Sequence, residues 1–294
     1  MELPCHPGST NELKGHAMSL DPDLILSLPI PARQVRYSDR DVMLYALAVG
    51  AGAEELSFIY EAGLQVIPSY AQMLGFDDSW LKPAGIDLAR VVHGGLDIRF
   101  HGVFAAEGEV EVQSRLVGLI DKGEGRGAIV NQETRLIQAG NPVSTSLSSL
   151  FLRGGGGFGG TRGVEAEQFR MPDAAPDAEI EVPTAANQAL LFRLLGDRNP
   201  LHIDPVTARA AGFDAPILHG ASTFGLACLT VIRRFCVGNP ARLERFASRF
   251  TGPIYPGETL IFSFWPRDTG VLFRARTKER RTPVLDGGYA ALRG

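Results

Sequence analysis

The feature that most constrains the fold is a run of glycines close to the middle of the chain. Residues 154–160 read GGGGFGG, and the polar stretch that follows contains two prolines. Glycine at this density disfavours helix and strand, because much backbone freedom would have to be lost. The run also lacks the Lys-Ser/Thr ending of a phosphate-binding P-loop. We therefore predict a glycine-rich linker at residues 153–178 between an N-terminal domain at 26–152 and a C-terminal domain at 179–294.

The two halves show the same order of elements. In the first half, Ser38 with Asp41 three residues later predicts a helix N-terminus. In the second half we expect a helix from Thr184 to Gly196 and a longer apolar helix from about residue 221 to 235. Alternating segments predict strands at 109–113, 128–130, 133–137, 245–250, 260–265, 271–277 and 288–292. Helix, loop, long helix and antiparallel strands, occurring twice, predict an α+β class in which a sheet wraps a central helix.

Composition excludes several functional classes. The 294 residues are 45% hydrophobic and 21% charged, as in ordinary globular proteins. No run reaches the roughly 18 apolar residues that a membrane span requires. With 29 Lys and Arg against 33 Asp and Glu, the net charge is −4. We therefore expect no nucleic-acid partner and no membrane partner.

The termini and the cysteines bear on the compartment. Cys5, Cys228 and Cys236 form neither a disulfide framework nor a metal-ligand spacing, so a reducing compartment is expected. Residues 1–25 lack the apolar core of a signal peptide and are predicted to be a flexible extension. The last residues carry no peroxisomal address. The expected location is the cytoplasm.

The densest polar cluster is the segment 196–205, GDRNPLHIDP. Asp197 and His202 stand five residues apart at a helix end stiffened by proline, and the turn between them lets both side chains point at one small volume. Such a pair can hold a water molecule and move protons near neutral pH. The Asn199 amide can orient that water or the imidazole. The alternative is a purely structural Asp–His hydrogen bond.

A second segment, PILHGAST at 216–223, brings Gly220 to the start of the long helix. Backbone N–H groups are unsatisfied there, and the helix dipole favours negative charge. An N–H at this place can polarise a carbonyl and stabilise an enolate. An ordinary helix start is the alternative. His93-Gly94 echoes His219-Gly220, and a structural role is favoured for it.

Residues 197–204 resemble the hydratase 2 motif of the MaoC-like (R)-specific 2-enoyl-CoA hydratases. Further segments resemble the hydratase unit of peroxisomal multifunctional enzyme type 2: YSDRD at 37–41, YAL at 45–47, FIYE at 58–61, DKG at 121–123, GGFGG at 156–160, PILHG at 216–220 and PIYPG at 253–257. These segments run from about residue 30 to 290 in the same order and at plausible spacing.

The resemblance implies a double hot-dog fold, in which two antiparallel sheets each wrap a central helix and join as an intramolecular pseudo-dimer. It also implies reversible syn hydration of trans-2-enoyl-CoA to (3R)-3-hydroxyacyl-CoA. The site residues implied are catalytic Asp197, His202 and Asn199, the oxyanion donor Gly220, and the substrate-binding residues Glu61, His219 and Pro216.

The chemistry requires no metal and no cofactor, since coenzyme A is part of the substrate. The first half lacks the Asp–His pair, so one active site per chain is expected. The first half is assigned to the acyl chain, with apolar loops near Ile67, Tyr70 and Trp80 that are equally explained as core.

Three alternatives remain open from the sequence. A dehydratase acting on acyl carrier protein, or on a specialised branched or steroid side-chain CoA ester, would have the same motif. A non-catalytic acyl-CoA binding module would keep the fold alone. A thioesterase would attack the carbonyl, whereas this motif places water for C3. The expected partner is an acyl-CoA thioester, and a homodimer is possible for this fold.

Overall fold

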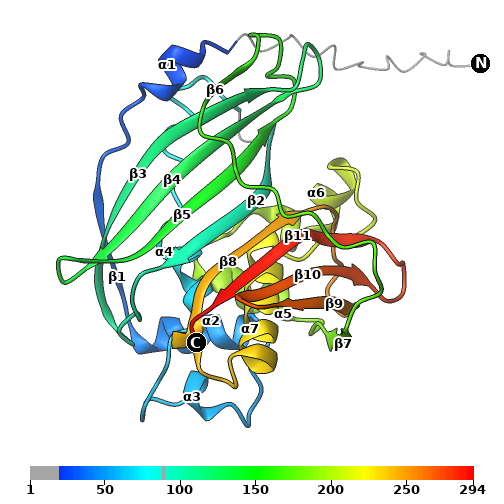
Figure 1. The fold of residues 1–294 in the computed structure, drawn as a ribbon. Coiled ribbons are helices and arrows are strands. Elements are labelled where there is room, and N and C mark those ends of the chain that lie inside the picture. The colour runs from blue at the N-terminus through cyan, green and yellow to red at the C-terminus, as the bar shows by residue number, and fades with distance from the viewer. Residues whose placement is uncertain (1–19, 88–89) are drawn as a thin grey trace, which may run out of the picture.

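The computed structural model describes residues 20–87 and 90–294. Eleven strands form one continuous antiparallel sheet that passes through both halves of the chain (Figure 1). The first half provides β1 (Arg33–Tyr37), β2 (Val91–Phe100), β3 (Gly108–Asp121), β4 (Ala128–Gln138) and β5 (Asn141–Leu152). The remaining strands are β6 (Thr161–Gly163), β7 (Ala178–Pro183), β8 (Leu243–Phe250), β9 (Thr259–Arg267), β10 (Gly270–Thr277) and β11 (Pro283–Leu292).

The sheet order joins the halves at a single seam. The order is β1-β3-β4-β5-β2-β8-β11-β10-β9-β7, with the short β6 on β3. At the seam, β2 and β8 pair antiparallel from Gly95 opposite Arg249 to Arg99 opposite Arg245. Each half is thus a sheet unit, and the two units meet edge to edge as the predicted pseudo-dimer.

Helices lie on one face of this sheet. They are α1 (Pro22–Leu26), α2 (Asp39–Ala48), α3 (Leu56–Ile59), α4 (Ala71–Leu74), α5 (Gln188–Phe192), α6 (Pro205–Ala210) and α7 (Gly220–Phe235). Short 3-10 turns are η1 (Pro68–Tyr70), η3 (Arg193–Leu195), η4 (Pro200–His202) and η5 (Pro240–Arg242). None of the helices in the described ranges is long and apolar enough to cross a bilayer.

The predicted start of α2 is confirmed by a capping box. The Ser38 side chain accepts from the N–H of Asp41, and the Asp41 carboxylate accepts from the N–H of Ser38. In the second half the first helix starts at Gln188, later than the predicted Thr184. The Thr184 hydroxyl instead donates to the Glu258 carbonyl at 2.8 Å, which fixes this residue to the start of β9.

The long helix α7 is the centre of the core. Its residues from Ser222 to Ile232 are all buried. Phe224 packs edge-on against Phe246 of β8, with ring centroids 4.8 Å apart. On the other side the Ser222 hydroxyl donates to the Ala48 carbonyl of α2 at 3.2 Å. α7 therefore lies between the second half of the sheet and the helices of the first half.

The two halves differ in the element at their centre. The order of elements predicts a long helix in each, but where the second half has α7 the described part of the first half has only η1 and the four-residue α4. Pro68 begins η1, and Gly75 is the C-cap residue of α4. The described part of the predicted extension is packed, since Ile25 of α1 is buried with Trp80 and Leu119. Residues 1–19, with Cys5, lie outside the described residues.

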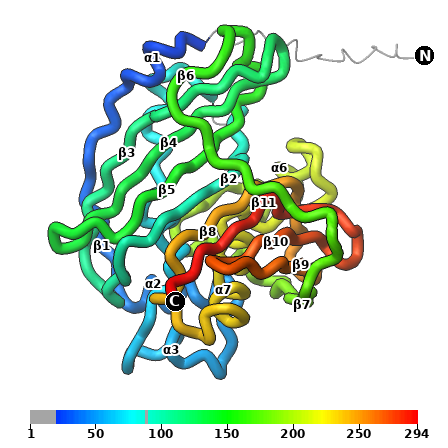
Figure 2. The backbone as a smooth tube through the Cα atoms, in the orientation of Figure 1, coloured from blue at the N-terminus to red at the C-terminus, as the bar shows by residue number. Residues whose placement is uncertain are grey.

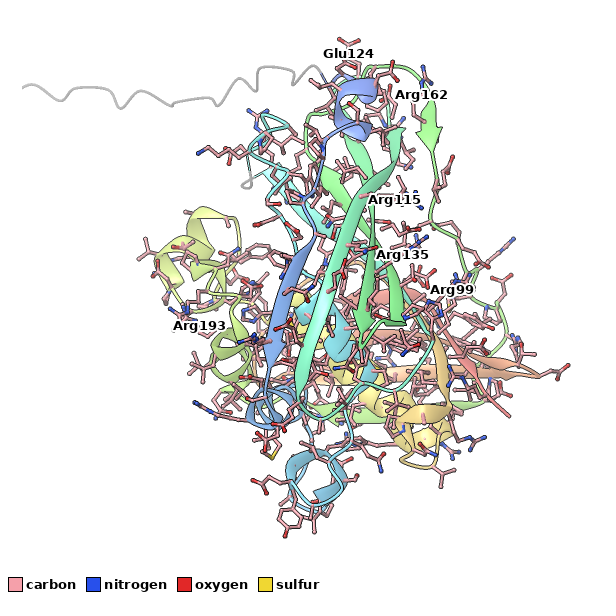
Figure 3. The ribbon with its side chains drawn as sticks, turned by 90° about the vertical axis from the view of Figure 1, so that its left-hand side faces the viewer. Arg99, Arg115, Glu124, Arg135, Arg162 and Arg193 are labelled. Atoms are coloured by element: carbon pink, nitrogen blue, oxygen red, sulfur yellow. The ribbon has the colours of Figure 1, made fainter. Side chains whose placement is uncertain are left out.

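The glycine-rich segment is held in place by one carboxylate. Asp121 accepts from the N–H groups of Gly123, Gly157 and Gly159 at 2.6–2.8 Å. From β6 the chain then runs over the sheet to β7, as Figure 2 shows. The Arg245 guanidinium of β8 binds this connection through Glu167 and binds Asp97 of β2. The connection is therefore fastened to the seam between the two halves.

Candidate active site

The Asp197–His202 segment is fixed by turns at both ends. Gly196 ends η3 with a φ of +121°, a backbone conformation that side chains disfavour. The Asn199 side-chain oxygen then caps η4 by accepting from the N–H of Leu201 at 3.0 Å. Asp204 caps α6 directly afterwards by accepting from the first-turn N–H groups. This places Asp197 before the turn and His202 at its end.

The structure brings Asp197 and His202 together with His219. One potential ligand atom from each of the three side chains lies within 4.8 Å of the others. The rings of His202 and His219 stack with centroids 3.7 Å apart and an interplanar angle of 27°. Both histidines are buried, and Asp197 is less buried. The Asp197–His202 proximity predicted from the sequence is therefore present.

Hydrogen bonds define which ring nitrogens are available. His202 Nδ1 lies 2.8 Å from the Ile217 carbonyl, which can only accept, so Nδ1 carries the proton and Nε2 keeps a free lone pair. His219 Nε2 lies 3.2 Å from the Asp197 carbonyl and by the same argument donates to it. His219 Nδ1 is buried and has no partner within the described ranges. Each ring thus keeps one nitrogen as an acceptor.

Burial keeps both imidazoles neutral. Burial and the neighbouring His202 lower the pKa of His219 to about 4. Burial also lowers the pKa of His202, while the Ile217 carbonyl and the Asp197 carboxylate oppose this shift. Two charged rings stacked at this distance would repel strongly. At neutral pH His202 is therefore a proton acceptor beside a carboxylate.

The same three side chains also have the composition of a metal site. A metal binds imidazole nitrogen along its in-plane lone pair at about 2.0–2.1 Å. One nitrogen of each ring already faces a carbonyl. His202 Nε2 and His219 Nδ1 are therefore the two ring nitrogens left for a ligand or a water.

Gly220 is the first residue of α7 and is exposed. His219 is the N-cap residue but makes no side-chain capping bond. The first backbone N–H groups of a helix have no partner within the helix, so they are available to a ligand oxygen. A Cβ at Gly220 would lie 3.5 Å from the Phe250 ring. The glycine therefore leaves a narrow space between the helix start and Phe250.

The first half contributes His93 to this region. Its ring centroid lies 5.0 Å from that of Phe250 across the β2–β8 seam, and its Nε2 lies 2.8 Å from the Ser148 hydroxyl. Burial lowers the pKa of His93 to about 4. The sequence favours a structural role for His93, and it does not predict the place of Phe250. The repeated His-Gly pair was the one signal that pointed to His93.

Not every predicted site residue joins the cluster. Pro216 is partly buried and directly precedes Ile217, so it is placed to support the carbonyl that binds His202. Glu61 is exposed and follows α3. The neighbouring Glu55 binds Arg233 near the C-terminal end of α7, and Figure 1 shows α3 far from α6. The structure does not bring Glu61 to Gly220, so a role for Glu61 stays a prediction.

Family models and known proteins match both halves of the chain. Residues 35–154 match the family model of the MFE-2 hydratase 2 N-terminal domain, and residues 167–287 match that of the MaoC like domain. The 3-hydroxyacyl-thioester dehydratase Y of Mycobacterium tuberculosis is 38% identical, over 94% of this chain and all of its own length. A probable enoyl-CoA hydratase 2 of Dictyostelium discoideum is 34% identical, over 94% of this chain and 97% of its own.

Solved structures share the fold. A MaoC-like dehydratase from Phytophthora capsici superposes with a TM-score of 0.86 at 29% identity, covering 93% of this chain and 98% of its own. A Mycobacterium tuberculosis protein described as a double hot-dog fold gives a TM-score of 0.56 at 15% identity, over 88% and 93% of the two chains. The chain belongs to the MaoC-like hydratase 2 family, and the predicted double hot-dog fold is confirmed.

Proposed function

We propose that this protein catalyses the reversible syn addition of water to trans-2-enoyl-CoA, giving (3R)-3-hydroxyacyl-CoA. The observation that carries the proposal is the placement of Asp197 and neutral His202 in one small volume beside the start of α7. Relatives named enoyl-CoA hydratase 2 support the same reaction.

The roles follow from the geometry. His202 Nε2 and the Asp197 carboxylate are both acceptors, so together they hold one water by its two hydrogens. As the water oxygen attacks C3, one of the two groups takes a proton, and a proton is returned to C2 from the same side. This explains syn addition. The Gly220 N–H is the proposed donor to the thioester oxygen, which becomes negative in the enolate.

The first half is proposed to hold the acyl chain. β5 lies in the interior of the sheet, yet Ser146, Ser148 and Leu150 on its helix-facing side are partly exposed. A side chain in the middle of a sheet is reached by solvent only from the face it points to. The space that α7 fills in the second half is therefore partly open in the first half.

The reaction as proposed requires no metal and no cofactor, because adding water to a conjugated thioester moves protons but no electrons. A cytoplasmic location and a homodimer belong to the same proposal. The free, buried thiols of Cys228 and Cys236 are compatible with a reducing compartment.

The direct test is to follow the ultraviolet absorbance of the conjugated thioester in crotonyl-CoA, with chiral analysis of the product. We expect absorbance to fall and (3R)-3-hydroxybutyryl-CoA to form. A parallel thiol assay for free coenzyme A should stay negative. Release of coenzyme A without hydration would indicate a thioesterase, and binding without turnover on enoyl thioesters of any chain length would indicate a non-catalytic module.

A further inference from the structure

The helix-facing side of the first-half sheet carries an unusual row of hydroxyl groups. Ser114 of β3, Thr134 of β4 and Ser146 of β5 stand opposite one another in the strand register. Ser148 stands one step further along β5. We call Ser114, Thr134, Ser146 and Ser148 the hydroxyl band. The Ser114 and Thr134 hydroxyls lie 3.0 Å apart, and Ser148 lies 2.8 Å from His93 Nε2.

The hydroxyl band lies between two apolar clusters. Alternation along the strands puts its members on the same side as Leu136 in one cluster and Val130 and Leu152 in the other. The inner side of a sheet is normally apolar where it is covered by core. The hydroxyl band therefore interrupts the core.

The second half provides an internal comparison. The corresponding side of its sheet is covered by α7 and carries mainly apolar, fully buried side chains: Phe246, Leu260, Phe262, Phe264, Val271 and Phe273. The hydroxyl residues on that side, Ser248 and Thr277, are also buried. Three members of the hydroxyl band, Ser114, Ser146 and Ser148, are partly exposed. An aliphatic chain alone would be matched by apolar residues in their place.

A further unsatisfied group lies nearby. Gln72 of α4 donates from Nε2 to the Tyr45 hydroxyl at 2.9 Å and to the Ala221 carbonyl at 3.0 Å, which uses both amide hydrogens. Its Oε1 is buried and has no partner within the described residues. A buried acceptor without a donor is costly. α4 lies over the hydroxyl band, because a Cβ at Gly75 would be 3.2 Å from Thr134 Cγ2.

The hydroxyl band is also continuous with the catalytic region. Ser148 bonds to His93, whose ring packs against Phe250, and Phe250 borders Gly220. Gln72 bonds to Ala221, the residue after Gly220. The hydroxyl band is therefore linked to Gly220 through His93 and Phe250, and Gln72 is linked to it through Ala221.

We infer that the hydroxyl band and Gln72 form a subsite for an acyl group that carries a hydroxyl. The substrate hydroxyl donates to Gln72 Oε1 and accepts from a serine or threonine of the hydroxyl band. Enoyl thioesters with a hydroxylated chain are then better substrates than aliphatic ones of equal length. This inference rests on the proposed hydration and adds the class of acyl group to it.

The test compares trans-2-hexenoyl, octenoyl and decenoyl-CoA, each with and without a terminal hydroxyl, by the ratio of kcat/KM values within each pair. One net hydrogen bond is worth about tenfold, so we expect a ratio of about ten at the chain length that reaches the subsite. Gln72→Leu and Ser146→Ala should each bring this ratio close to one. Ser149→Ala is the matched control, because Ser149 lies on the opposite side of β5 and bonds to Asn131.

The outcomes separate the two proposals. If crotonyl-CoA is hydrated but the hydroxylated substrates show no advantage at any length, the subsite is overturned and the hydration stands. If the ratio of kcat/KM values stays near ten in both Gln72→Leu and Ser146→Ala, the subsite is also overturned. If none of the enoyl-CoA substrates is hydrated at any chain length, the proposed function fails and the subsite with it.

Discussion

The stacked pair of His202 and His219 makes the stability of the fold depend on pH. His219 is 1% exposed, and burial together with His202 lowers its pKa to about 4. In the unfolded chain a histidine has a pKa of about 6.5. Between these values the unfolded state binds a proton that the folded state does not bind. The free energy of unfolding therefore falls as the pH drops through this window.

The magnitude follows from the two pKa values. From about pH 7.5 to about pH 5, the linkage relation gives a loss of about 2 kcal/mol from His219 alone. Above the unfolded pKa the contribution is fully present. His219→Gln removes the titrating group but keeps an amide nitrogen where Nε2 donates to the Asp197 carbonyl. Between pH 7.5 and pH 5, the free energy of unfolding of the variant is therefore expected to fall by about 2 kcal/mol less than that of the wild type.

The assay is urea denaturation of the wild type and His219→Gln at both pH values. The control is the same substitution at an exposed histidine bonded to Thr145, His101→Gln, which checks for effects of the substitution itself. If wild type and His219→Gln lost equal stability on acidification, His219 would not be held neutral by burial. The description of the site as two neutral rings would then be wrong.

Three further substitutions test the packing of the fold. Gly225→Ala places a Cβ 2.4 Å from Val49 Cγ1, so it should lower the free energy of unfolding by about 1–3 kcal/mol in urea titrations, and an unchanged midpoint would contradict the contact. Arg245→Met leaves the largely buried Asp97 carboxylate without its cation, so it should lower the free energy of unfolding by about 3–5 kcal/mol in the same titrations. A decrease of less than about 1 kcal/mol would show that the ion pair is not structural. Asp121→Ala removes the acceptor of three glycine N–H groups, so limited proteolysis should cut residues 153–160 faster than in wild type, and equal rates would refute the anchoring role.

Local sequence patterns identify the elements that are defined by helix caps or by a run of apolar residues. The capping box at Ser38, the Asp204 cap and the apolar run of α7 are each readable from neighbouring residues, and the structure contains all three. The Asp197–His202 spacing predicts their proximity because a short turn fixes it. The same reasoning fails for β5, whose inner side carries serines and shows no clean alternation of apolar and polar residues. The serines of the hydroxyl band remove the alternation from which a strand would be predicted, and they are also the most distinctive feature of β5.

Local sequence patterns do not predict the contacts between the two halves. The approach of His93 to Phe250 depends on the β2–β8 register, which joins residues about 150 positions apart. The stacking of His202 on His219 depends on how α7 is seated against the sheet. The order of elements also predicts a second long helix, but at the place of α7 the described part of the first half has only η1 and the four-residue α4. The acyl chain is proposed to lie where that helix is missing.

The central claim is that Asp197 and His202 act on one water. The most direct measurement is a double-mutant cycle on crotonyl-CoA with Asp197→Asn, His202→Gln and the combined variant, each shown to be folded by urea titration. We expect each single change to lower kcat/KM by about 10²–10⁴-fold and the combined variant to lose little more than the worse single variant, because the pair works as a unit. Wild-type kcat/KM in either single variant, or losses that simply multiply in the combined one, would contradict the claim.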